Sequence, residues 1–227
     1  MIESDKFKQV VSEFSEFIET IDETDNFGKR MCYLFEQALD NIKNEHLEIG
    51  MLLLCTVIES IAAKRNYEEY KTFDYWVSNM GDFDNFIKEI KETDEPRKII
   101  EKWHIIYRET YGPRKNFINI IVDTYKTLNI IPGFMKFKTV VKNGVEKTTY
   151  RTEGYNDINE YLTEFRKAIG HVYDESRCPF AHQGKFLRFD IRIQTKIGGL
   201  SSPRSISLQD MATITFNVMK ANINNCK

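Results

Sequence analysis

One arginine and one histidine, Arg177 and His182, stand five positions apart in the sequence Arg177-Cys-Pro-Phe-Ala-His182. A guanidinium group holds a phosphate group through two parallel hydrogen bonds, and an imidazole with a pKa of about 6.5 exchanges protons at neutral pH. Together they predict a site that binds a phosphate group and exchanges protons. The alternative interpretation is structural: Arg177 would be a solvated or ion-paired residue at a helix end, and His182 a capping or core histidine.

A helix is expected to lead to these two residues. Over 158–172, apolar side chains recur every three or four positions, as on one buried helix face, at Ile158, Leu162, Phe165, Ile169 and Val172. Asp157 and Glu160 are typical of a capping box at its start. On an unbroken helix the arginine and histidine would point about 140° apart. Pro179 disfavours an unbroken helix, so we expect a kink or helix end there that turns both side chains toward one cleft.

The totals exclude several classes of protein. A formal net charge of −2 over 227 residues gives no global sign of a nucleic-acid or membrane binder, so any anion site must be local. No apolar run matches a secretory leader or a membrane span. The four cysteines show no paired framework: Cys32, Cys55, Cys178 and Cys226. Free thiols and a cytoplasmic location are therefore expected.

Apolar periodicity predicts a mostly helical chain. We expect helices over 4–21, 27–44, 48–64, one or two short ones within 67–93 broken at Gly81, and further ones over 96–107, 114–128 and 208–219. Asn143-Gly144 between β-prone flanks predicts a hairpin over 138–150, and alternating residues predict a strand over 186–194. The fold class expected is an all-α bundle with a small β-hairpin and strand decoration.

Residue types mark three of the helix boundaries. Pro96 is expected in the first turn of its helix, where proline costs no hydrogen bond. Gly112-Pro113 should end one helix and begin the next. Ser207 with Asp210 is expected to cap the last helix.

The helix expected over 48–64 is apolar nearly all round, so it should be the central buried helix. Glu59 is unusual inside such a run, because a buried carboxylate needs a partner. Either Glu59 pairs with a neighbouring helix for structural reasons, or it lies near an active cleft.

Basic residues gather locally despite the negative total. Lys185, Arg188 and Arg192 lie on or beside the expected strand, where they would form either a track for a phosphate backbone or an ordinary solvated face. Arg114 and Lys115 stand at a helix start, where positive charge opposes the helix dipole. That position indicates an anion or an acidic partner, or else a plain solvated pair.

Two other patterns favour structural interpretations. The aromatic residues over 67–86 are expected to be core rather than a platform for stacked bases. His171, Cys178 and His182 are irregularly spaced and lack the paired pattern of a zinc site. Neither a metal nor a cofactor is therefore expected.

The arginine–histidine tract resembles the R-x4–6-H signature of the HEPN superfamily, all-α proteins of toxin–antitoxin, CRISPR-associated and RNA-processing systems. Two more segments carry the resemblance. Leu52-Leu-Leu-Cys-Thr-Val-Ile-Glu59-Ser looks like the first core helix of the family with its acidic residue. Tyr111-Gly-Pro-Arg-Lys-Asn-Phe117-Ile is similar to the "YG-x-R-x-x-F" tract of the Apea-like branch, and 172–184 lines up with its "Y-x-x-R-S-x-x-x-H-G" block.

The resemblance covers about residues 47–223, so we expect a HEPN-like domain over 46–227 and an N-terminal helical extension, 1–45, packed on its core. It implies a metal-independent endoribonuclease in which Arg177 and His182 are catalytic. A homodimer with two-fold symmetry would place two such pairs across one cleft.

Around this pair, Glu59 and Tyr173 are expected to support the site, and the basic residues 185–192 to contact RNA. The resemblance also implies a defence or toxin-like system with an antitoxin or nucleotidyltransferase partner. Two alternatives stay open. One is a non-catalytic HEPN module that binds RNA, a nucleotide or a protein. The other is an interaction protein whose residues 1–45 recruit a subunit, with a large exposed apolar face on 4–21.

Overall fold

The computed structural model describes residues 5–70, 73–79, 83–129, 136–142, 145–151, 158–174 and 206–223, with backbone alone at 66–70, 136–142, 145–151, 158–161, 164 and 171. This part of the chain is mostly helical, as predicted. Its elements are α1 (Asp5–Ile18), α2 (Asn26–Lys43), α3 (Leu47–Tyr70), α4 (Phe73–Asn79), α5 (Phe83–Lys91), α6 (Pro96–Tyr111), α7 (Pro113–Leu128), β1 (Lys136–Lys142), β2 (Val145–Arg151), α8 (Ile158–Val172) and α10 (Leu208–Ile223).

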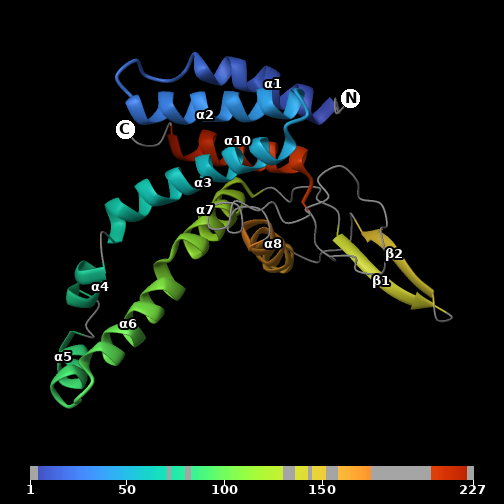
Figure 1. Cartoon of the computed structure of the whole chain (residues 1–227). Coiled ribbons are helices and arrows are strands. Elements are labelled where there is room, and N and C mark those ends of the chain that lie inside the picture. The colour runs from blue at the N-terminus through green and yellow to red at the C-terminus, as the bar shows by residue number, and fades with distance from the viewer. Residues whose placement is uncertain are drawn as a thin grey trace.

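Helix α3 is the centre of the main bundle. It packs against α2, α10 and α7 (Figure 1). Two pairs of adjacent side chains on α3 are fully buried, Leu54 with Cys55 and Val57 with Ile58, so the buried face of the helix is broad. The prediction of a central buried helix is confirmed, although α3 continues to Tyr70 rather than ending near Lys64.

Helices α1 and α2 share this core through an aromatic cluster. The ring of Phe35 on α2 lies 4.9 Å from that of Phe14 on α1 and 5.9 Å from that of Phe216 on α10. Phe17 adds an edge contact to Phe216 at 5.6 Å. The apolar face of α1 is therefore buried, with Ile18 its exposed exception. The large exposed apolar face required by the interaction-protein alternative is absent from the described residues 5–21.

Capping residues fix several helix ends. Asp25 accepts a hydrogen bond from the Gly28 amide at 2.8 Å and begins α2. Pro96 occupies the first turn of α6. Ser207 accepts from the Asp210 amide at 3.1 Å and donates to the Asp210 carboxylate at 2.6 Å. The predictions for Pro96 and for Ser207 with Asp210 are confirmed.

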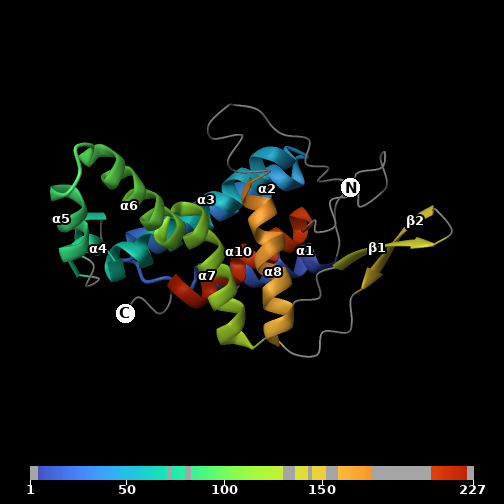
Figure 2. The same ribbon diagram turned by 90° about the horizontal axis from the view of Figure 1, so that it is seen from below.

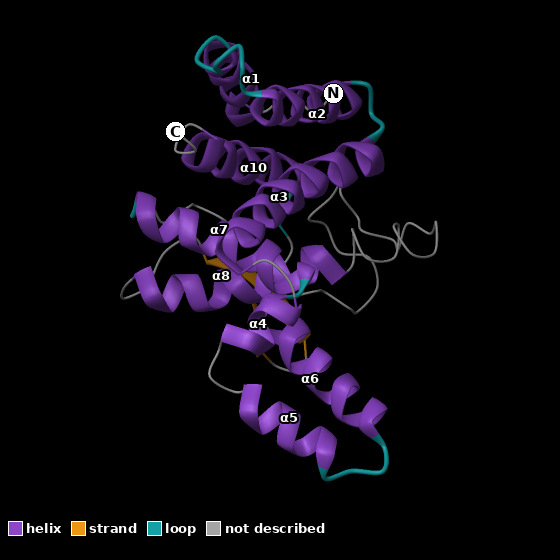
Figure 3. Cartoon of the chain, turned by 90° about the vertical axis from the view of Figure 1, so that its left-hand side faces the viewer, coloured by secondary structure: helices purple, strands orange, loops and turns teal. Residues whose placement is uncertain are grey.

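Helices α4, α5 and α6 (residues 73–111) form an arm that extends from the bundle (Figure 3). The arm has a small core of its own around Trp76, Val77 and Trp103. Trp103 also donates from Nε1 to Glu89 at 3.1 Å, which links α6 to α5. The prediction that the aromatic run is core is confirmed for Trp76, which is buried, with Phe73 and Phe86 half-buried against the same cluster. It is wrong for Tyr75 and Phe83, which are each 43% exposed. Gly81, the expected break between the two short helices, lies outside the described residues.

Gly112 joins the arm to the bundle without a linker. It is the last cap of α6 and the first cap of α7, with φ −65° and ψ 160°. A Cβ atom at Gly112 would lie 2.2 Å from the Arg108 carbonyl oxygen. Because that oxygen is backbone, this close approach requires glycine. The expected end and start of two helices at Gly112-Pro113 is confirmed.

Strands β1 and β2 pair antiparallel, in register from Lys136 opposite Arg151 to Lys142 opposite Val145. This hairpin projects away from the helices (Figures 1 and 2). The expected turn at Asn143-Gly144, the capping residue Asp157 and the strand expected over 186–194 lie outside the described residues.

Cys32 and Cys55 are buried free thiols. Burial raises the pKa of Cys32 to about 11, so this thiol is protonated at neutral pH. The other two cysteines lie outside the described residues. Among the helices described, none combines the length and apolar composition that crossing a membrane requires.

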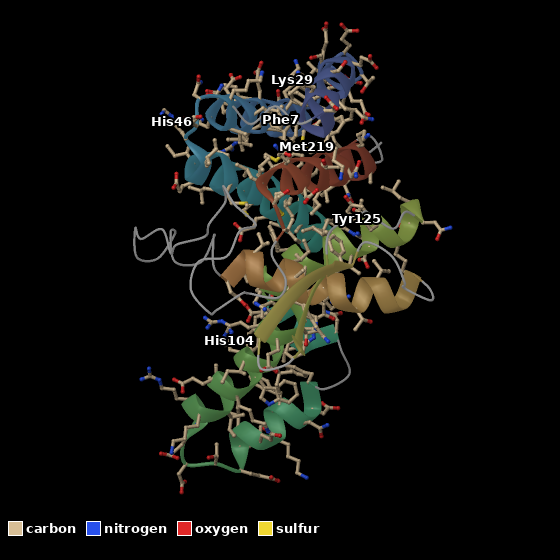
Figure 4. All side chains as sticks on the ribbon, turned by 90° about the vertical axis from the view of Figure 1, so that its right-hand side faces the viewer. Phe7, Lys29, His46, His104, Tyr125 and Met219 are labelled. Atoms are coloured by element: carbon tan, nitrogen blue, oxygen red, sulfur yellow. The ribbon has the colours of Figure 1, made fainter. Side chains whose placement is uncertain are left out.

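Tyr125 ties α7 to two other helices. Its ring lies 5.3 Å from Phe165 on α8, and its hydroxyl accepts a hydrogen bond from Asn217 on α10 at 3.0 Å. Figure 4 shows Tyr125 at the level between those two helices. Burial raises the pKa of Tyr125 to about 12, while the hydrogen bond from Asn217 acts in the opposite direction.

Replacing Phe216 by alanine should lower the free energy of unfolding by about 3–5 kcal/mol, because it leaves a cavity where α1, α2 and α10 meet. Urea denaturation measures this change. Tyr33→Ala is the matched control, since Tyr33 is 59% exposed on α2 and its loss should change stability by no more than about 0.5 kcal/mol. Equal effects would contradict the aromatic cluster as the contact that holds these helices.

The raised pKa of Tyr125 leads us to predict that the protein loses stability at high pH. Its folded pKa of about 12 exceeds the ordinary value of 10.0, so its contribution is complete below pH 10 and is lost as the pH rises toward 12. A difference of one between the folded and unfolded pKa values corresponds to a loss of about 1.4 kcal/mol. Unfolding measured between pH 9 and 12 should show a smaller slope in Tyr125→Phe, whereas Tyr33→Phe should keep the wild-type slope.

Candidate functional site

The structure describes the helix that precedes the arginine–histidine pair but not the pair itself. Arg177 and His182 lie outside the described residues, as do the three basic residues expected to contact RNA, Lys185, Arg188 and Arg192. The supporting residues Glu59 and Tyr173 are described. The described part of α8 and the residues after it ends at Asp174, three positions before Arg177.

Helices α7 and α8 lie side by side and run in opposite directions (Figure 2). Arg166 in the middle of α8 donates to Asn119 on α7 at 2.7 Å. The start of α7 consequently meets the end of α8. Two of the segments that carry the family resemblance, 111–118 and the beginning of 172–184, are thus neighbours in space although about 60 residues separate them.

Arg114 and Asp174 join these two helix ends by an ion pair. Arg114 donates from Nε to one carboxylate oxygen of Asp174 and from Nη2 to the other, each at 2.8 Å. These hydrogen bonds raise the pKa of the Arg114 guanidinium further above its ordinary value. The two side chains are 52% and 49% exposed, so the pair lies at the surface where α8 ends.

Beneath the ion pair, the ring of Tyr173 packs on that of Phe117 at 5.2 Å and 57°. Both side chains are buried. This packing attaches the end of α8 to the first turns of α7. The supporting role expected of Tyr173 stays a prediction.

Gly170 provides space for the guanidinium of Arg114. A Cβ at Gly170 would lie 2.7 Å from Nη2 of Arg114, and 3.6 Å from Cδ1 of Ile118. A larger residue at this position would therefore compete with Arg114 for the same volume. The glycine lets the arginine cross α8 closely on its way to Asp174.

Glu59 lies in the middle of α3, between buried residues, and is half-buried with its Oε1 atom inside the protein. Its side chain interacts with other groups of the chain. The two interpretations of Glu59, structural pairing and a role beside a cleft, both stay predictions.

Within the described residues, no three His, Cys, Asp or Glu side chains gather closely enough to hold a metal ion. The zinc alternative involves the His171 ring, Cys178 and His182. None of these side chains is among those described.

The sequence analysis identified neither Asp174 nor Gly170. One pattern did indicate that an acidic group such as Asp174 should be present. Two adjacent cations at the start of a helix, Arg114 and Lys115, indicated an anion or an acidic partner. The acidic partner is confirmed for Arg114 and is Asp174. Lys115 is exposed, as its solvated interpretation requires.

Comparisons of the chain with protein-family models, curated proteins and solved structures give no match. The functional assignment therefore depends on the residues of this chain.

The contacts at the end of α8 should differ in their contribution to stability. Phe117→Ala should lower the free energy of unfolding by about 3–5 kcal/mol, since Phe117 is fully buried and its removal leaves a cavity. Arg114→Ala should lower it by less than about 1 kcal/mol, because exposed ion pairs contribute little. Urea denaturation of the two variants compares these effects; a larger loss in Arg114→Ala would contradict this division.

Proposed function

We propose that the chain is a metal-independent endoribonuclease of HEPN type, in which Arg177 and His182 form a composite site at a homodimer cleft. In this proposal Lys185, Arg188 and Arg192 contact the RNA backbone. The enzyme acts in a defence or toxin-like system, where an antitoxin or a nucleotidyltransferase is its protein partner.

The observation that carries the proposal is the contact between residues 111–118 and 172–174. These are the segments that resemble two separate motifs of the Apea-like branch. The Arg114–Asp174 ion pair and the packing of Phe117 on Tyr173 bring them together. A chance similarity of two short sequences gives no reason for such contact, so this contact supports the proposal.

The residue types fit cleavage by the RNA 2′-hydroxyl. The 2′ oxygen attacks phosphorus and loses its proton to a base, while the bond from phosphorus to the 5′ oxygen breaks and that oxygen gains a proton. The products are a 2′,3′-cyclic phosphate and a 5′-hydroxyl. An imidazole exchanges these protons at neutral pH, and a guanidinium stabilises negative charge on the phosphoryl oxygens. None of these steps needs a metal.

A dimer supplies the groups that one chain lacks. The proposed site of a single chain has one arginine, Arg177, and one histidine, His182, but cleavage needs a base, a proton donor and a charge stabiliser. A two-fold dimer would double both groups in one cleft, and two-fold dimers are the commonest oligomers. Sedimentation equilibrium tests this part: a monomer at the concentration where RNA is cleaved would contradict the composite cleft.

The cleavage test uses labelled RNA and purified protein in excess EDTA. The wild type should cleave, His182→Ala should be about 10²–10⁴-fold slower, and Arg177→Ala about 10²–10³-fold slower. His46→Ala is the matched control, since His46 is an exposed histidine between α2 and α3 (Figure 4). It should keep wild-type activity.

The chemistry gives two further readouts. RNA with 2′-O-methyl groups throughout should not be cleaved, and the products of normal RNA should end in cyclic phosphates. Binding of RNA without turnover, equal in wild type and His182→Ala, would contradict the nuclease and favour a non-catalytic HEPN module.

A further inference from the structure

We propose that Arg114 and Asp174 are positioning residues of the proposed site: their ion pair orients the end of α8 and thereby the direction in which the chain continues to Arg177. This inference rests on the proposed nuclease function and adds two residues to it. Neither residue contacts RNA in this account.

The ion pair has a geometry that fixes orientation as well as distance. Arg114 uses Nε and Nη2 for two different oxygens of Asp174, each at 2.8 Å. Two parallel hydrogen bonds prevent the guanidinium and carboxylate planes from turning independently. A lysine ammonium would act as a point charge and fix only the distance.

The sequence of α8 accommodates this geometry at the expense of helix propensity. Gly170 lies one turn before Asp174, on the same face of the helix, and its missing Cβ would fall 2.7 Å from Nη2 of Arg114. Glycine inside a helix is less favourable than alanine. Gly170 therefore weakens the helix, but it leaves the space that the Arg114 guanidinium needs to reach Asp174.

The ion pair contributes little to folding, so its geometry has another use. Both side chains are about half exposed, at 52% and 49%, and exposed pairs add little to the free energy of unfolding. The buried contact of Phe117 with Tyr173 already holds the helix ends together. Packing thus attaches α8 to α7, and the ion pair determines the orientation of its end.

Orientation at Asp174 matters because Arg177 is close along the chain. The Cα atoms of these two residues are at most roughly 10–11 Å apart, since each residue spans at most about 3.6 Å. The proposal is that a change in the direction of the chain at Asp174 changes the position of Arg177. A displacement of about 1 Å at a catalytic group costs about 10²-fold in rate.

Charge exchange tests the proposal. Arg114→Asp and Asp174→Arg should each lower kcat for RNA cleavage at least about tenfold, with KM changed less than about twofold. The double variant, which restores opposite charges, should recover most of kcat. Arg114→Lys should fall between. Lys220→Ala removes a matched inter-helix ion pair, Lys220 with Glu13 at 3.0 Å on α10 and α1, and should leave kcat unchanged.

Gly170→Ala separates positioning from stability. The added Cβ displaces the flexible end of Arg114, while alanine favours the helix. The variant should be at least as stable as the wild type and yet lose kcat. The proposal would be overturned if Gly170→Ala is stable, its Arg114 guanidinium is displaced from Asp174, and its kcat is nevertheless unchanged.

Hydrogen exchange without RNA provides a readout that does not depend on activity. Peptides covering 168–176 should exchange faster in both single charge variants and return to the wild-type rate in the double variant. If wild type cleaves no RNA, the proposed function fails, and exchange alone decides whether the ion pair orders this helix end. If the double variant recovers slow exchange but not kcat, and its KM rises, Arg114 binds RNA directly and the positioning role is overturned. Unchanged exchange in both single variants overturns it as well.

Discussion

The fold depends on burying the broad apolar face of α3. This face is too wide for one neighbour to cover, and α2, α7 and α10 bury it together. The N-terminal helices are part of this arrangement, because the rings of Phe14, Phe35 and Phe216 meet in the same core. Residues 5–43, which precede the family resemblance, are therefore built into the bundle. Their burial in this core agrees with an N-terminal extension packed on it, and the boundary after residue 45 stays a prediction.

Helix α8 takes its position from α7. Its aromatic contacts reach that helix at both ends, Phe165 on Tyr125 and Tyr173 on Phe117, and α7 is in turn buried against α3. The core therefore positions α7, and α7 positions the exposed end of α8. Buried helices thus hold the exposed end of α8 in a fixed position.

Much of this fold could be predicted because several helices bury one apolar stripe, and because Pro96 and Ser207 mark where two of them begin. The end of α1 could not: Thr20 donates its hydroxyl to the Phe17 carbonyl at 2.7 Å, and such local hydrogen bonds compete with the helix. The sequence indicated an anion or acidic partner for Arg114 but not that this partner is Asp174, since exposed charges 60 positions apart leave no periodic pattern. Likewise, aromatic composition predicted burial of Trp76 but not a separate core.

The junction at Gly112 has a mechanical consequence. A single residue both ends α6 and begins α7, so only its two backbone torsions separate a long projecting arm from the helix turn that holds Arg114. The chain also joins the arm to the bundle at its other end, where α3 leads to α4. A force applied at α5 would therefore reach the bundle through two connections, and the one at Gly112 acts directly on the base of α7.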